Sequence, residues 1–189
     1  EGSLEELSRF MPAASIDSLV SFHSHHGVFG SWELFYPVLR TIILRERAEH
    51  LKRFAEVTEG IENLIYEAAK KESNFEKFIA RVKSKRFTRT RVQRMLTHIY
   101  TGFTWEQLRS FEKPSYLRLL GMTEAGRQYL NVRKKNIELP LISRAADLSD
   151  RMGGIDIHAS YMYLSGMGIA DLQKEYSTPP YYLASKSAK

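Results

Sequence analysis

Apolar residues recur at helical spacing along most of the chain. From Glu59 onward five of them follow the order i, i+3, i+4, i+7 and i+8, which is one face of a helix. These residues are Ile61, Leu64, Ile65, Ala68 and Ala69. The same spacing predicts a second helix that begins with Ser73 in a capping box, and a third that runs from Thr88 or Thr90 to about Thr101.

The third predicted helix separates a core face from a basic face. Its apolar positions are Val92, Met95, Leu96, Ile99 and Tyr100. At about 100° per residue, Arg91, Arg94 and His98 project from the opposite side. We therefore expect this helix to pack on a hydrophobic core while it presents cations to solvent.

The N-terminal part is less regular in its pattern. Residues 1–30 are expected to contain a helix end followed by irregular chain, because Pro12 and the Gly27–Gly30 pair break regular structure. Ser31 can cap the apolar stretch that follows it. Pro37 indicates that the regular helix starts there, since the first turn needs no N–H from proline. A charged helix then continues to about Val57.

The C-terminal part predicts one short strand and two further helices. Residues 116–121 are short, apolar and ended by glycine, as in a buried strand. Thr123 caps a helix that ends at three consecutive cations, and a last helix spans residues 155–165. The predicted fold class is mainly α, a helical domain with at most one or two short strands. We divide the chain into a helical segment (1–58), a basic helical core domain (59–176) and a tail (177–189).

Composition excludes several classes of protein. The chain has 189 residues, 43% of them hydrophobic and none of them cysteine. The absence of cysteine rules out disulfide scaffolds, Cys-ligated zinc, iron–sulfur clusters and thiol nucleophiles. No apolar run approaches the roughly 18–20 residues of a membrane span. These features predict a cytoplasmic protein that does not enter a membrane.

Charge changes the picture once it is resolved along the chain. The formal net charge is +6, but residues 81–135 hold 14 basic and three acidic residues, a net charge of +11. The rest of the chain carries 14 basic and 19 acidic residues, a net charge of −5. Residues 81–94 contain seven cations and no carboxylate. Because nothing nearby in the sequence neutralises these cations, we expect a polyanion as partner.

No catalytic or metal-binding constellation stands out. His23, His25 and His26 are adjacent, and adjacent residues rarely converge on one metal. No glycine-rich phosphate loop is present, and Asp147 and Asp150 resemble loop or capping residues. The sequence therefore predicts no catalytic residue, no metal site and no cofactor bound by this chain.

Two motifs resemble a known family. The chain reads Glu59-Gly60-Ile61-Glu62-Asn63 and then Lys83-Ser84-Lys85-Arg86-Phe87-Thr88-Arg89-Thr90-Arg91-Val92-Gln93-Arg94. Residues 32–37 (WELFYP) and 118–123 (RLLGMT) add shorter matches. In these motifs the chain resembles the bacterial tRNA(Met) cytidine acetate ligases of the HIGH nucleotidyltransferase superfamily.

The resemblance implies a two-part enzyme. The family's N-terminal half is a Rossmann-like domain with an HxGH motif, which activates acetate with ATP and Mg²⁺ and acetylates the wobble cytidine of elongator methionine tRNA at N4. That motif does not occur here, and the sequence opens without methionine in what resembles the middle of a helix. We therefore expect the C-terminal half of such a ligase, with segment 1–58 leading from a missing nucleotidyltransferase domain that would be its partner.

The resulting hypothesis is a tRNA-binding C-terminal domain without the catalytic half, inactive alone, with tRNA as partner. The basic motif would contact the tRNA backbone or the adenylate phosphates. The predicted RNA-binding residues are Lys83, Lys85, Arg86, Arg89, Arg91, Arg94, Arg118, Arg133, Lys134 and Lys135. The alternative is a basic docking or dimerisation domain that packs on an acidic partner domain without touching RNA.

Overall fold

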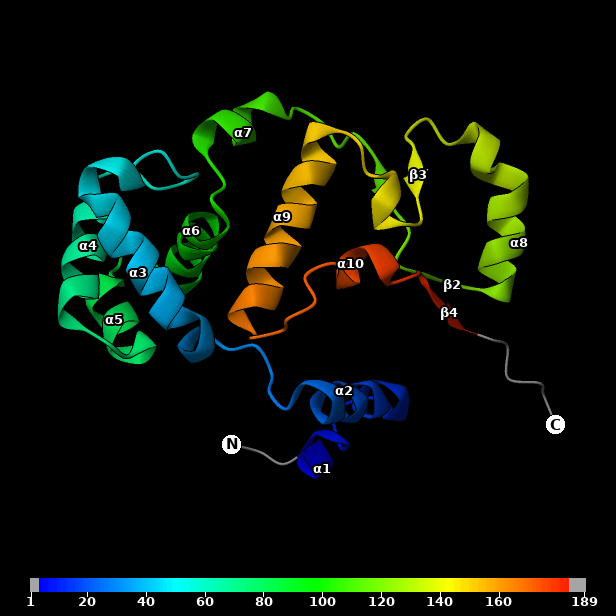
Figure 1. Cartoon of the computed structure of the whole chain (residues 1–189), viewed down its shortest axis with the longest axis horizontal. Helices are drawn as coiled ribbons and strands as arrows, with labels where there is room; N and C mark the ends of the chain where they lie inside the picture. The colour runs from blue at the N-terminus through cyan, green and yellow to red at the C-terminus, as the bar shows by residue number, and fades with distance from the viewer. Residues whose placement is uncertain (1–3, 184–189) are drawn as a thin grey trace.

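A computed structural model describes residues 4–183 of the chain (Figure 1). Residues 4–110 contain the helices α1 (Leu4–Leu7), α2 (Ala13–His26), α3 (Trp32–Leu51), α4 (Ile61–Lys71), α5 (Phe75–Val82), α6 (Arg89–Thr101) and α7 (Trp105–Ser110). The remainder contains β1 (Leu117–Arg118), β2 (Gly121–Thr123), α8 (Glu124–Arg133), β3 (Leu141–Ile142), α9 (Arg151–Gly166), α10 (Lys174–Ser177) and β4 (Tyr181–Leu183). Two short 3₁₀ helices, η1 (Lys134–Asn136) and η2 (Ala145–Asp147), lie between them.

The hydrophobic core lies between α3, α4, α5 and α6, which cluster at one end of the molecule (Figure 1). Tyr36, Leu39 and Ile43 of α3 are fully buried in this core, and the Tyr36 ring contacts the rings of Phe75 and Phe78 of α5. Full burial of one such side chain contributes about 1.5–3 kcal/mol relative to its exposure. The core is therefore strong enough to fix the segments that connect these helices.

Helix α6 confirms the prediction made from its periodicity. All five of its predicted core positions, from Val92 to Tyr100, are buried. Thr88 is the N-cap, and its hydroxyl accepts a hydrogen bond from the Arg91 amide at 3.4 Å. Gly102 ends the helix in the left-handed conformation, with φ of 74°, which glycine adopts without a Cβ penalty.

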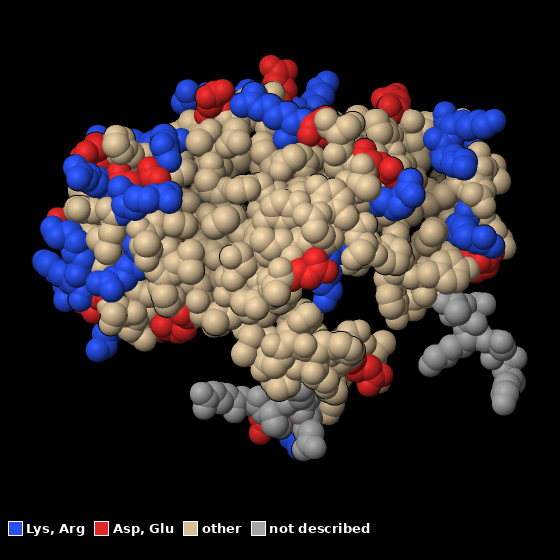
Figure 2. Space-filling view, viewed as in Figure 1, with Lys and Arg blue, Asp and Glu red and all other residues tan. Residues whose placement is uncertain are grey.

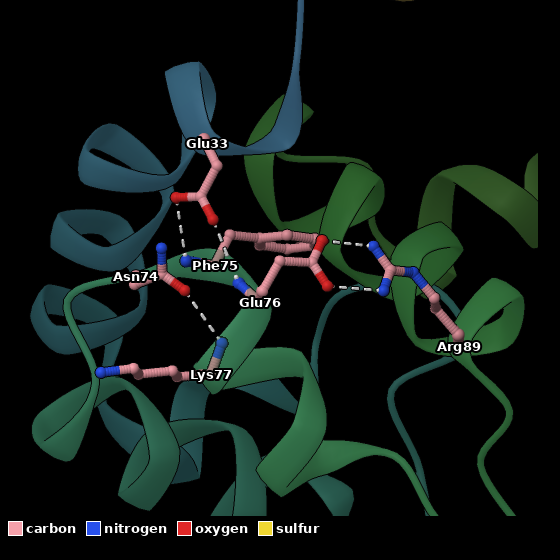
Figure 3. A network of polar contacts seen from close by, with 6 residues as sticks. All are labelled: Glu33, Asn74, Phe75, Glu76, Lys77 and Arg89. Atoms are coloured by element: carbon pink, nitrogen blue, oxygen red, sulfur yellow. Dashed lines mark hydrogen bonds and ion pairs between the residues drawn. The ribbon is translucent and has the colours of Figure 1, made fainter. Parts of the chain in front are cut away.

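The starts of α3 and α5 differ from the prediction. Helix α3 begins at Trp32, and Pro37 lies inside it rather than at its start. Asn74, not Ser73, is the N-cap of α5, since its Oδ1 accepts from the Lys77 amide at 3.0 Å. The Glu33 carboxylate is a second cap of α5, since it accepts hydrogen bonds from the amides of Phe75 and Glu76 (Figure 3). These amides are 42 and 43 residues away in the sequence, so no local pattern indicated this cap.

Residues 1–30 are also more regular than predicted. The described part of this segment holds the 14-residue helix α2. Pro12 directly precedes this helix and Gly27, with φ of 75°, follows it. The two breakers therefore bound a helix, where the prediction had irregular chain. None of the helices in residues 4–183 has the length and apolar character of a membrane span.

The predicted fold class is wrong in its strands. The described residues contain four short strands in two parallel pairs, where at most one or two strands were expected. Leu117 and Arg118 of β1 align with Leu141 and Ile142 of β3, and β2 pairs with β4, which lies in the predicted tail. These strands escaped prediction because each is two or three residues long and its partner is distant in the sequence. They are also more exposed than a buried strand, since Leu117 is 44% exposed.

Helix α9 crosses from this second part to the helical core and packs on α3 and α6. The close packing of α9 on α3 and α6 depends on Gly166 at the C-terminal end of α9. A Cβ at this position would overlap the Tyr100 hydroxyl and lie 2.5 Å from Cδ1 of Phe35. Gly154, in the first turn of the same helix, faces open space instead.

We expect Gly166→Ala to lower the free energy of unfolding by about 1–3 kcal/mol, because the methyl group forces α9 away from two aromatic rings. Gly154→Ala is the matched control and should raise it by up to about 1 kcal/mol, since alanine favours helix. Urea denaturation followed by circular dichroism measures both. Equal effects of the two substitutions would contradict this packing.

Candidate nucleic-acid interface

The basic motif forms the end of α5, a short loop and the start of α6. The loop closes on itself, because the Ser84 amide donates to the Phe87 carbonyl at 2.9 Å and the Phe87 amide donates to the Ser84 hydroxyl at 3.1 Å. The Phe87 ring is buried and anchors the loop on the core. Folding therefore fixes the backbone on which these cations are carried.

Four of the seven cations of residues 81–94 form ion pairs, which the sequence analysis did not expect. Their carboxylates come from other segments, nine to 38 residues away. The pairs are Arg81–Glu72, Arg86–Glu59, Arg89–Glu76 and Arg94–Glu56. The expectation that no nearby carboxylate neutralises these cations is therefore wrong in the folded chain.

The pair between Arg89 and Glu76 has the most regular geometry (Figure 3). Both guanidinium nitrogens of Arg89 donate to the Glu76 carboxylate, at 2.7 and 2.6 Å. The guanidinium carbon also lies 6.0 Å from the centre of the Phe75 ring. The hydrogen bonds from Arg89 hold the pKa of Glu76 below its ordinary value. This arginine is thus held in one position by α5.

Three cations of the motif have no carboxylate partner among the described residues. Lys83 and Lys85 are exposed, whereas Arg91 is partly exposed and lies over the Phe87 ring at 5.0 Å. Arg91 also donates to the Arg86 carbonyl at 3.4 Å. A phosphate can approach these three cations without displacing a carboxylate, so they are the strongest candidates for anion contact.

The remaining predicted RNA-binding residues lie elsewhere. Arg118 on β1 is paired with Glu175, and both side chains are only 24% exposed. Arg133, Lys134 and Lys135 are exposed at the end of α8 and in η1. Figure 2 shows Lys and Arg over α3–α5 at one end of the molecule, along the upper edge over α7, and over α8 at the other end, with largely uncharged surface in the middle of the view. The structure therefore does not unite the ten residues in one patch.

The first turn of α4 holds a polar feature that the sequence did not indicate. Glu62, from the Glu59–Asn63 motif, is 3% exposed, and its Oε2 is buried with no hydrogen-bond partner. It lines a cleft of about 530 Å³ together with Lys52, Trp105 and Arg109. A glutamate in the first turn of a helix gives no sequence signal of burial, because that position usually faces solvent.

The fold and this geometry can be compared with known proteins. The family model described as HIGH Nucleotidyl Transferase matches residues 1–177. The chain belongs to this family. As a HIGH nucleotidyl transferase, it is similar to curated proteins named tRNA(Met) cytidine acetate ligase.

Two of these relatives show the extent of the match. The protein from Lysinibacillus sphaericus is 54% identical over 182 residues, which cover 94% of this chain and 45% of the relative. The protein from Bacillus subtilis is 35% identical over 164 residues, which cover 85% of this chain and 40% of the relative. The chain thus spans less than half the length of these two relatives.

Solved structures share the fold. The apo structure of Thermotoga maritima TmcAL superposes with a TM-score of 0.81 at 20% identity, covering 96% of this chain and 50% of that chain. A second structure of that protein, described as bound with alpha-thio ATP, also gives a TM-score of 0.81 and covers 98% of this chain and 52% of that chain.

These findings correct several predictions. The prediction of a C-terminal half that lacks the nucleotidyltransferase domain is wrong, because the HIGH Nucleotidyl Transferase model matches residues 1–177 of the chain itself. The predicted function, a tRNA-binding domain with the catalytic half absent, is wrong for the same reason. The docking-domain alternative and the separate N-terminal nucleotidyltransferase partner rested on that division and lose their basis with it. The prediction of no cofactor in this chain has no support either, since the family model covers the chain.

The pair between Arg89 and Glu76 predicts a pH effect. Because the folded-state pKa of Glu76 is lowered, the pair stabilises the fold above the ordinary glutamate pKa and this contribution is lost as the pH falls through the lowered value. We expect Glu76→Gln to lose less stability than the unaltered chain between about pH 5 and pH 3, since the glutamate pKa lies near 4.3. Urea denaturation at each pH measures this difference.

Glu138→Gln is the control, because Glu138 is exposed and forms no ion pair within the described part of the chain. If both variants show the same acid response as the unaltered chain, the pair contributes nothing to stability.

Proposed function

We propose that the chain belongs to an ATP-dependent tRNA(Met) cytidine acetate ligase and contributes a phosphate-binding edge for tRNA. The proposed reaction is supported by the 54% identity to such a ligase over 94% of the chain. The edge consists of Lys83, Lys85 and Arg91. The buried Phe87 ring and the Ser84–Phe87 hydrogen bonds keep the loop between them in position.

The geometry supports a positioning role for this edge. Three cations on the loop and the first turn of α6 neutralise phosphates but do not read base identity, so they would orient tRNA without selecting a sequence. Arg86, Arg89 and Arg94 hold carboxylates and would contribute only if phosphates displaced these carboxylates. Arg133, Lys134 and Lys135 form a second basic region that a long ligand such as tRNA could reach.

ATP would activate acetate: a carboxylate oxygen of acetate would displace pyrophosphate from the α-phosphate, which gives a mixed acyl–phosphate anhydride. The unpaired cations offer donors that suit phosphate oxygens. Among the described residues, no group of three or more His, Asp or Glu side chains forms a metal site. We therefore assign no Mg²⁺ ligand in this chain.

Replacement of Lys83, Lys85 and Arg91 by alanine should weaken tRNA binding and make it less sensitive to salt. Three lost phosphate contacts reduce the slope of log K against log salt by about 2–3. Fluorescence anisotropy with labelled tRNA(Met) measures this slope. The salt concentration is varied from about 50 to about 200 mM, where binding to phosphates depends strongly on salt.

The control replaces three exposed arginines that are already paired, Arg127, Arg144 and Arg151. It removes the same charge, so an equal loss of slope in both triple variants would contradict a specific edge. Acetate- and ATP-dependent formation of acetylcytidine in tRNA(Met), measured by nucleoside mass spectrometry, tests the reaction in the protein that carries this chain.

A further inference from the structure

A larger cleft lies between α3 and α9, two helices that pack on each other (Figure 1). Val38, Ile42 and Arg45 line it from α3, and the C-terminal end of α6 also borders it. His158 and Met162 line it from α9. Its volume of about 650 Å³ lies within the range of roughly 300–1,000 Å³ that is typical of small-molecule sites. The phosphate-binding edge lies at the opposite end of α6, so the two regions are separate.

A buried carboxylate holds two arginines at one end of this cleft. Glu46 is 8% exposed, and its two oxygens contact Nη2 of Arg45 and Nη2 of Arg53, each at 2.9 Å. The two arginine side chains are themselves 71% and 56% exposed. Arg53 also lies over the Phe54 ring, which leaves the N–H groups in the plane of its guanidinium accessible. Within residues 4–183 neither guanidinium has a second acceptor, so both retain donors for another anion.

The backbone is strained directly beside this cluster. Helix α3 kinks at Arg47, whose φ of 57° and ψ of 165° form a conformation that is essentially restricted to glycine. Strain of this kind in other residues concentrates at active sites and ligand clamps. It is a second observation, independent of charge, that favours a binding site at this end of the cleft.

The other end of the cleft is apolar and accessible. Val38 is 44% exposed, and Ile42 and Met162 are partly exposed. On α3 the positions 38, 42 and 45 follow one another at i, i+4 and i+7, so the apolar and charged parts share one face of the helix. A ligand that fills the cleft therefore combines an anionic head with an apolar body.

Charge distinguishes between the two common kinds of anionic head. The two arginines and the one glutamate of the cluster leave a net charge of +1. A carboxylate matches this charge, whereas a phosphate monoester carries about −1.5 to −2 near pH 7. Arginine forks also bind the two oxygens of a carboxylate in a bidentate geometry. The cluster thus favours a carboxylate.

We propose that the cleft binds a small organic acid with a single carboxylate and an apolar chain of several carbons. Arg45 and Arg53 donate to the carboxylate, and the chain lies against Val38, Ile42 and Met162. Acetate, the substrate of the proposed reaction, has only a methyl group and does not cover this wall. The cleft is therefore a site distinct from that reaction, and the proposal does not rest on the proposed function.

Titration with hexanoate of the chain with isotope-labelled methionine methyl groups tests the site. The chain has six methionines, and Met162→Leu identifies the NMR signal that belongs to the cleft. Hexanoate should shift this signal saturably. Acetate and hexanol each supply only one part of the ligand and should need at least about tenfold higher concentrations. Burial of about two methylene groups, or one hydrogen bond to a charged group, corresponds to about tenfold in affinity.

Variants separate the charged cluster from general effects of charge. Arg45→Gln and Arg53→Gln should each weaken hexanoate binding about tenfold and leave hexanol unchanged, since each removes a charge-assisted hydrogen bond. Arg144→Gln is the matched control, because Arg144 is 70% exposed and paired with Asp147 outside the cleft. It should bind hexanoate as the unaltered chain does. Hexyl phosphate should bind no more tightly than hexanoate, because no cation matches its second negative charge.

Equal affinities for hexanoate and acetate, tighter binding of hexyl phosphate, a shift confined to other methionines, or no shift at all would overturn the proposal. An equal loss of affinity in Arg144→Gln and Arg45→Gln would do the same. These outcomes are distinct from failure of the proposed function, because salt-dependent tRNA binding through Lys83, Lys85 and Arg91 is measured separately and does not require an occupied cleft.

Discussion

The packing of α3 against α4, α5 and α6 is the interaction on which the rest of the structure depends. Its buried face carries Tyr36, Leu39 and Ile43, and its first turn supplies the Glu33 carboxylate that caps α5 (Figure 3). One helix thus determines both the core and the starting point of α5. Because α5 leads directly into the basic loop, the position of the loop follows from this packing rather than from its own sequence.

The same packing explains why much of the basic motif is electrostatically balanced. Glu72 and Glu76 lie at the two ends of the α4–α5 connection, and Glu56 and Glu59 lie in the α3–α4 loop. All four reach the motif because α3 packs against both α4 and α6, and α5 packs against α6. A net charge of +11 over residues 81–135 therefore overstates the free positive charge, and the unpaired side chains are a better guide to anion binding than the count of cations.

Local signals in the sequence were sufficient for some elements and insufficient for others. Helix α6 was predicted with its cap, its core face and its glycine end, since all three signals lie within 15 residues. The pairing of β2 with β4 was not predictable, because it joins segments about 60 residues apart through strands of three residues. The carboxylate partners of Arg86 and Arg94 were not predictable either, because they too are distant in the sequence. The motif-based resemblance found the right family, but placing the chain within it required the family model.

The α3–α4 loop shows how the fold sustains a strained arrangement beside the cleft. Glu56 and Glu59 have positive φ angles of 65° and 66°, which cost a residue other than glycine about 1–2 kcal/mol each. Their ion pairs with Arg94 and Arg86 are at the surface, where such pairs contribute only about 0–1 kcal/mol. Burial of Phe54 and Val57 contributes more, about 1.5–3 kcal/mol per side chain.

Apolar anchoring, not charge, therefore holds the loop in this conformation. The charged side chains take the positions that the anchored backbone gives them. The buried carboxylate of Glu62 lies in the first turn of α4, directly after this anchored loop. A loop selected for stability alone would relax this strain by placing glycine at residue 56 or 59. This chain has glutamate at both positions despite the strain. Such strain favours a site in which the placement of the carboxylates serves a function.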